Sequence, residues 1–240
     1  FSHLIFFKKN RYTRYDVLST YELINAKHVY TNEETEPVRS VELSYTTNKI
    51  KNIIRPADGY YIKLSSTLFG TILGGERDFF QVNNEYRKYI PIMFRSILAF
   101  RYKMGYIHVL NKKENLPFYY KYELGGQSSL RGWLNMEKYD DSGGKLIYDL
   151  VNLEYRLPIY KKWGCGIFID MGRLYNDIND FIKKHLNWNY GLGITYDTAF
   201  GPLRIEYAIP YVRTSDYQGG ANESDQNNSG QMHASLLYMF

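Results

Sequence analysis

The chain has 240 residues, a formal net charge of +5 and a mean hydropathy of −0.45, and it contains 25 tyrosines and 13 phenylalanines. No apolar run approaches the roughly 18 residues that a membrane-spanning helix requires, so the sequence offers no such helix. Its single cysteine, Cys165, excludes an internal disulfide framework. No nucleic-acid-binding module is evident, so no nucleic acid partner is expected.

Apolar and polar residues alternate in many segments of the chain, and this period of two predicts β-strands. The expected strands lie near residues 15–30, 37–49, 60–72, 77–90, 93–106, 145–159, 163–172, 188–198, 201–212 and 230–240, with a further candidate at 1–9. In the clearest segment Trp188, Tyr190, Leu192, Ile194 and Tyr196 alternate with polar residues and glycines. The clearest strands run about 9–11 residues, the length that crosses a bilayer core at a tilt.

A soluble β-sandwich would also show this alternation, with its apolar faces packed into a core about ten ångströms thick. Here the apolar face is rich in Tyr, Trp and Phe near the strand ends, and such aromatics are typical of the girdle at a membrane interface. In lipid, only a closed sheet satisfies every backbone hydrogen-bonding group. The sequence therefore favours an all-β fold, an antiparallel transmembrane β-barrel.

The links between the expected strands alternate in length. Short links are expected around Asn10, Ala57, Pro91, Lys161 and Phe200, and most of the links at the other end are longer. Outer-membrane barrels have short periplasmic turns and longer external loops. The short links are therefore expected on the periplasmic side.

The longest link contains a polar loop, residues 124–133 with the sequence LGGQSSLRGW. The loop has three glycines that allow tight folding, one arginine and a terminal tryptophan: Gly125, Gly126, Gly132, Arg131 and Trp133. A guanidinium group requires acidic or other accepting partners. Two carboxylates on the polar faces of later strands, Glu154 and Asp170, are candidates.

Several motifs follow one another in an order that resembles the C-terminal barrel half of the BamA/TamA superfamily. They are LGGQSSLRGW at 124–133, NLEYRLP at 152–158, GIFIDMG at 166–172, YGLGITYD at 190–197, GPLRIEYAIP at 201–210 and the terminal Phe240. The similarity is clearest from Tyr119 to Phe240. The resemblance implies a complete barrel of sixteen strands, of which about eleven are represented here. It also implies a long external loop that folds into the barrel lumen.

The resemblance also assigns roles within this loop. Arg131 matches the arginine of the family's R-G-F/Y motif, and Trp133 stands in place of the usual Phe or Tyr. Glu154 and Asp170 match the acidic lumen residues with which that arginine associates, through charge-assisted contacts. An alternative is that both carboxylates are solvated lumen groups that pair with Arg156 or Arg101.

The end of the chain resembles the signal by which barrel strands are recognised during assembly. Tyr238 and the terminal Phe240 are expected to share a strand face with Leu236, and His233 occupies a position where a polar residue is common. Ser235 stands where a glycine is usual. An unpaired strand edge can template another strand, and in this family the proposed place is the seam between the first and last strands.

Residues 1–240 are expected to form one transmembrane β-barrel domain that is the C-terminal portion of a longer barrel. The periplasmic transport modules that precede the barrel in most relatives are absent from this chain. If residues 1–9 are not a strand, the count falls to ten, and a small complete barrel is the alternative.

The resemblance implies a non-enzymatic protein of the Gram-negative outer membrane that assembles or translocates other outer-membrane proteins through a lateral seam. Its expected partners are the lipid bilayer and lipopolysaccharide, unfolded outer-membrane proteins, and accessory lipoproteins or periplasmic modules. No cofactor, metal spacing or catalytic motif is found. Alternatives are a two-partner secretion pore, a barrel that anchors or exports a fused passenger domain, a passive pore, and an organellar outer membrane.

Overall fold

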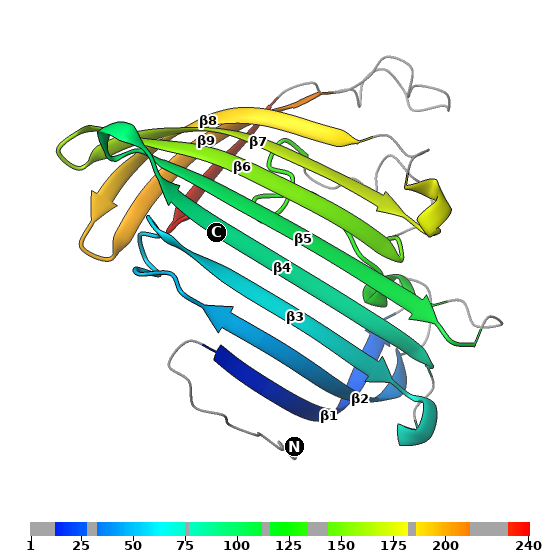
Figure 1. The fold of residues 1–240 in the computed structure, drawn as a ribbon. Helices are drawn as coiled ribbons and strands as arrows, with labels where there is room; N and C mark the ends of the chain where they lie inside the picture. Colours follow the sequence, from blue (N-terminus) through cyan, green and yellow to red (C-terminus); the bar gives the residue numbers. More distant parts are fainter. Residues whose placement is uncertain are drawn as a thin grey trace, which may run out of the picture.

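The computed structural model describes residues 13–27, 33–74, 77–111, 116–133, 144–181, 186–211 and 230–240. In this part of the chain, ten strands form one antiparallel sheet in which each strand pairs with its neighbours in sequence (Figure 1). The strands are β1 Thr13–Lys27, β2 Glu33–Asn48, β3 Gly59–Phe69, β4 Phe79–Pro91, β5 Ile97–Val109, β6 Ile147–Tyr160, β7 Trp163–Tyr175, β8 Asn187–Thr198, β9 Gly201–Tyr211 and β10 Gln231–Leu236. The predicted all-β antiparallel fold is confirmed.

Burial along the strands is inverted relative to a soluble protein. In β9 the side chains of Arg204 and Glu206 are 1% exposed, whereas Ile205 between them is 56% exposed. In β7 Asp170 is fully buried and Ile169 is 41% exposed. Water-soluble sheets bury their apolar face, so the outward apolar face of this sheet is built to contact lipid. This observation excludes the sandwich alternative.

Most predicted strand ends differ from the observed ones by only a few residues. The strand expected at 93–106 begins at Ile97, because Met93–Arg95 form a turn in which Phe94 and Arg95 both have positive φ angles, 59° and 61°. The candidate strand at 1–9 lies outside the described residues. No helix in the described ranges is long and apolar enough to span a membrane.

At one end of the sheet the strands are joined by the links 92–96, 161–162 and 199–200, which are short as predicted. The link at 49–58 lies at the same end, and the prediction that it would be short is wrong. Its residues make their own contacts across the sheet, as described below.

The end of the chain also differs from the prediction. Strand β10 stops at Leu236, which is 56% exposed, and Leu237 adopts a positive φ of 78° that turns the main chain. Phe240 then lies on the inner side and is 3% exposed. The expectation that Tyr238 and Phe240 share a strand face with Leu236 is wrong. The Tyr238 ring instead lies 3.8 Å from the guanidinium carbon of Arg156, a cation–π contact that alternation cannot reveal.

Candidate functional site

The loop at residues 124–133, here called the arginine loop, folds into a compact unit on the inner side of the sheet. Gly125 and Gly126 have positive φ angles of 133° and 76°, which residues with a side chain rarely adopt. The Ser129 hydroxyl accepts from the Gly125 amide and donates to the Gly125 carbonyl, both at 2.7 Å. The Gly126 amide donates to the Trp133 carbonyl at 2.5 Å and closes the loop.

Gly132 lets the arginine loop approach the barrel wall closely. A Cβ atom at this position would lie 2.6 Å from Cβ of Asn189 and 2.9 Å from the nitrogen of Pro210. Both distances are shorter than real Cβ contacts, and the Pro210 nitrogen is a main-chain atom of β9 that cannot rotate away as a side chain can. The glycine is therefore required by space, whereas Gly125 and Gly126 are required by backbone conformation.

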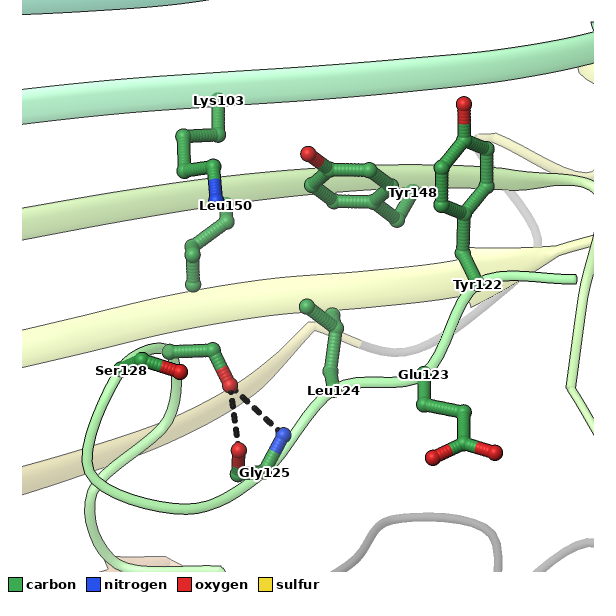
Figure 2. Close-up of a pocket in the computed structure, with 9 residues that line it drawn as sticks. Lys103, Tyr122, Glu123, Leu124, Gly125, Ser128, Tyr148 and Leu150 are labelled. Carbon is green, nitrogen blue, oxygen red and sulfur yellow. Dashed lines mark hydrogen bonds between the residues drawn. The ribbon is translucent and has the colours of Figure 1, made fainter. Parts of the chain in front are cut away.

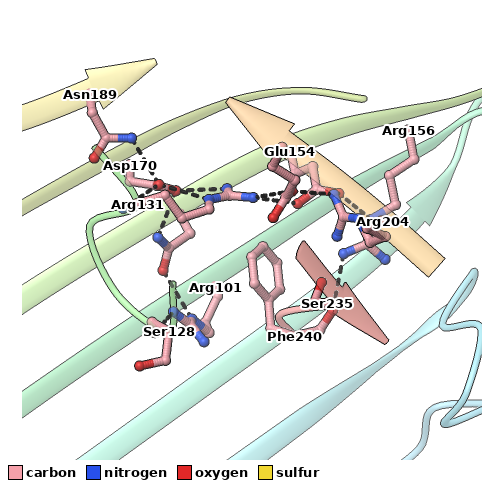
Figure 3. A network of polar contacts seen from close by, with 12 residues as sticks. Arg101, Ser128, Arg131, Glu154, Arg156, Asp170, Asn189, Arg204, Ser235 and Phe240 are labelled. Carbon is pink, nitrogen blue, oxygen red and sulfur yellow. Dashed lines mark hydrogen bonds and ion pairs between the residues drawn. The ribbon is translucent and has the colours of Figure 1, made fainter. Parts of the chain in front are cut away.

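Arg131 and Asp170 form a bidentate ion pair in the interior (Figure 3). The Arg131 Nε donates to Asp170 Oδ2 at 2.9 Å, and Nη2 donates to Oδ1 at 2.8 Å. The Arg131 main-chain amide also donates to Oδ2 at 3.2 Å. Both side chains are fully buried. This fork geometry fixes the direction of the loop as well as its position.

The remaining guanidinium nitrogen of Arg131, Nη1, contacts two further carboxylates. It donates to Glu154 Oε2 at 3.2 Å and to Glu206 Oε1 at 2.9 Å. The structure therefore brings Arg131 together with Glu154 and Asp170 and adds Glu206, which the sequence analysis missed. Its position beside Arg204 on the polar face of GPLRIEYAIP was the available signal.

Two arginines of the wall complete the network. Arg156 Nε donates to Glu154 Oε1 at 2.8 Å, and Arg204 Nη2 donates to the same oxygen at 2.7 Å and to Glu206 Oε1 at 2.6 Å. The alternative pairing of Glu154 with Arg156 is therefore present together with the Arg131 contact. The formal charges of Arg131, Arg156, Arg204, Glu154, Asp170 and Glu206 cancel. Because ion pairs lose solvation when buried, we assign this network to positioning of the loop.

An aromatic ring supports Arg131 from one side. The guanidinium carbon lies 3.4 Å from the ring centroid of Phe168 in β7. A Cβ atom at Gly191 of the neighbouring strand would lie 2.3 Å from Cζ of Phe168. Gly191 therefore leaves the space in which the ring lies flat beneath the cation. Phe168 is an apolar residue on the polar face of its strand, and that anomaly could have identified it.

Amide side chains hold Asp170 in turn. Asn152 Nδ2 donates to Oδ1 at 2.7 Å, and Asn189 Nδ2 donates to Oδ2 at 2.9 Å. Asn152 also donates to the Ser129 carbonyl, at 2.8 Å. Side chains from β6 and β8, the strands on both sides of β7, therefore hold the Asp170 carboxylate in the orientation in which it binds Arg131.

Two more contacts tie the main chain of the arginine loop to distant strands. Arg101 in β5 donates through Nη2 to the Ser128 carbonyl at 2.7 Å and through Nε to Asn152 Oδ1 at 2.9 Å. His233 in β10 donates through Nε2 to the Arg131 carbonyl at 2.6 Å. The loop thus contacts the final strand directly, through one of the residues of the predicted terminal signal.

Apolar packing anchors the other side of the loop. Trp133 is 7% exposed and belongs to a buried cluster with Leu124, Leu130, Tyr148 and Leu150. Beside this cluster lies a pocket of about 380 Å³, which Lys103, Tyr122 and Glu123 also line (Figure 2).

Tyr122 connects this side of the loop to β4. Its hydroxyl donates to Asn83 Oδ1 at 2.7 Å and accepts from Gln81 Nε2 at 3.0 Å. Burial raises the pKa of the Tyr122 phenol to about 12, although these hydrogen bonds act in the opposite direction. Tyr122 therefore remains a neutral donor at physiological pH. The described residues contain no cluster of metal-ligating side chains.

Comparison with known proteins agrees with this architecture. The family model described as the Omp85 superfamily domain matches residues 8–231. The chain belongs to the Omp85 superfamily. The crystal structure of BamA from Haemophilus ducreyi lacking POTRA domains 1-3 is similar, with a TM-score of 0.65 and 19% sequence identity. The match covers 80% of this chain and 42% of the BamA chain, and at this identity it shows the fold.

The predicted resemblance to the BamA/TamA superfamily is confirmed by these two findings. Membership in the Omp85 superfamily supports an outer-membrane β-barrel protein. The chain spans less than half of the length of the BamA chain that it matches.

Proposed function

We propose that the full-length protein containing this chain assembles or translocates other outer-membrane proteins through a lateral seam, without enzymatic chemistry. The observation that carries the proposal is the buried Arg131 network, which joins the arginine loop to β6, β7 and β9, together with the His233 contact to β10. These contacts couple the position of an internal loop to the last strand of the sheet.

Strand β10 has the features of a seam that opens. Within the described residues, β10 pairs with β9 at six positions, from Gln231 opposite Ala208 to Leu236 opposite Leu203. The β8–β9 ladder has eleven, from Trp188 opposite Tyr211 to Thr198 opposite Gly201. A shorter ladder has fewer inter-strand hydrogen bonds to separate. The exposed backbone groups of an edge strand can pair with an incoming strand.

The substrates that fit this mechanism are unfolded outer-membrane proteins, because their strands supply complementary backbone edges. The apolar outer face would contact the bilayer and lipopolysaccharide of a Gram-negative outer membrane. Accessory lipoproteins or periplasmic modules are further proposed partners. Each of these assignments rests on family membership together with the geometry of the loop and the edge.

A secretion pore or passenger exporter is the second candidate, because a lumen can also conduct an unfolded chain. The observation that favours it is an interior lined with charged side chains, in which the arginine loop is held by side-chain contacts. A passive pore is less well supported, since the arginine loop occupies part of the lumen.

Depletion of the full-length protein in its native cell separates these functions. Mass spectrometry would quantify every other outer-membrane barrel and its unfolded precursor. General assembly predicts a broad loss of barrels with accumulation of precursors. An unchanged barrel proteome with one missing exported protein would overturn the assembly proposal and favour secretion.

A further inference from the structure

The link at residues 49–58, between β2 and β3, is much longer than the other links at its end of the sheet, and it is internally ordered. The amides of Ile54 and Arg55 both donate to Asn52 Oδ1 at 3.0 Å. The Lys51 amide donates to the Asp58 carbonyl at 3.3 Å, and the two side chains form an ion pair. This link therefore has a defined shape.

Arg55 at the centre of this link contacts a distant part of the sheet. Its Nε lies 3.1 Å from Asp197 Oδ1, and its Nη2 donates to the Thr198 carbonyl at 2.7 Å, both at the end of β8. Five inter-strand spacings separate β3 from β8, which is about 24 Å along the sheet at about 4.8 Å per spacing. The link therefore reaches across the concave side of the curved sheet.

The link also faces the interior. Pro56 is buried, and its carbonyl accepts from Nη1 of Arg156, a member of the Arg131 network, at 3.5 Å. Ile50 packs against the buried cluster that contains Phe240. A methyl carbon of Ile54 lies 3.3 Å from the place that a Cβ would occupy at Gly201. Figure 1 shows the cyan β2–β3 link at the same end as the orange β8–β9 turn and the C-terminus.

We propose that residues 49–58 form a strap that closes the short-turn mouth of the lumen and opens by release of Arg55 from the end of β8. The strap joins two sides of the curved sheet, contacts the turned-in C-terminal residues and lies over the Arg156 side chain. This inference does not rest on the proposed assembly function, because it concerns access to the lumen whatever passes through it.

The ion pair that joins the strap to β8 is weak enough to open reversibly. The side chains of Arg55 and Asp197 are 44% and 43% exposed. Exposed ion pairs contribute at most about 1 kcal/mol, whereas breaking a buried pair costs about 3–5 kcal/mol. The strap should therefore be released while the fully buried Arg131–Asp170 pair remains intact.

Single-channel recording of the full-length protein in planar lipid bilayers tests this gate. Arg55→Glu should raise the fraction of time spent in conducting states by about two- to tenfold, because it replaces an exposed attraction with a repulsion. The double reversal Arg55→Glu with Asp197→Arg should bring that fraction back toward the original value. Arg95→Glu in the β4–β5 link at the same end of the sheet is the matched control, since it makes the same substitution at an exposed arginine outside the strap.

Two outcomes would overturn the proposal. One is an unchanged open fraction in Arg55→Glu protein whose gel mobility before and after heating shows a folded barrel. The other is an equal increase in the Arg95→Glu control, which would assign the effect to the net charge at this end of the barrel.

A covalent tether provides the second measurement and covers the case of a variant that fails to fold. Arg55→Cys and Asp197→Cys, in a Cys165→Ala background, would be joined by a short cleavable thiol reagent after folding. The joined protein should conduct less than the same sample after cleavage. Failure to form the link, or equal conductance in the linked and cleaved protein, would overturn the proposal.

Discussion

The substitution Asp170→Asn tests whether the buried carboxylate holds the arginine loop in place. Asp170 accepts from three nitrogens of Arg131 and from the amide side chains of Asn152 and Asn189. An asparagine has the same shape but offers one acceptor oxygen and a donor group that would face other donors. Removing one partner of a buried ion pair costs about 3–5 kcal/mol. Arg131 keeps Glu154 and Glu206, so we expect about 3 kcal/mol.

Urea unfolding of the full-length barrel in lipid vesicles measures this loss as a change in the free energy of unfolding. Asp197→Asn is the matched control, because it makes the same substitution in the Arg55–Asp197 pair, whose side chains are 44% and 43% exposed. A pair that water still reaches should contribute about 1 kcal/mol or less. Equal losses in the two variants would refute the argument that burial makes the Arg131 contact the dominant one.

Three further predictions concern the arginine loop. Gly132→Val should displace the loop from β8 and β9, because even a Cβ would lie 2.6 Å from Asn189, and hydrogen exchange of residues 124–133 should then rise well above that of the original protein. Trp133→Phe should keep the loop packed, whereas Trp133→Ala should cost about 3–5 kcal/mol by opening a cavity, which thermal unfolding can distinguish; equal effects would contradict the packing argument. The pKa of Tyr122 is raised from 10.0 to about 12, so the contribution of Tyr122 to stability should be fully present below pH 10 and lost as pH rises through 12. Tyr122→Phe should abolish this part of the pH dependence when unfolding is measured over a series of alkaline pH values. An alkaline profile that is unchanged in the variant would count against this prediction.

The period of two revealed most of the fold, because a transmembrane strand must place one face against lipid and the other against the lumen. This requirement is local, and it places Asp170 and Ile169 on opposite faces without knowledge of the tertiary structure. The resemblance then suggested which loop residue to pair with the lumen carboxylates. Glu206 was missed because its distance from Arg131 depends on the curvature of the sheet, which the sequence pattern does not encode.

The two errors at the short-turn end have a common physical cause. The segment from Leu236 to Phe240 is entirely apolar and contains no glycine or proline that would announce a turn, but the chain turns inward where the arginines of β6 and β9 make cation–π contacts with Tyr238. Likewise, the link near Ala57 was expected to be short because the other links at that end are short, and the sequence pattern does not reveal its contacts with the end of β8. Long-range contacts of this kind override the local pattern at the ends of strands.

The central claim is that the docked arginine loop is needed for assembly, and reversal of its main ion pair tests it most directly. Cells that carry only Arg131→Glu, only Asp170→Arg, or both substitutions would be compared by the fraction of a reporter outer-membrane barrel that reaches its folded form. The account predicts that each single substitution impairs folding of the reporter and that the double reversal restores part of it. Normal assembly in the single variants, or no restoration in the double variant at equal protein levels, would contradict the claim.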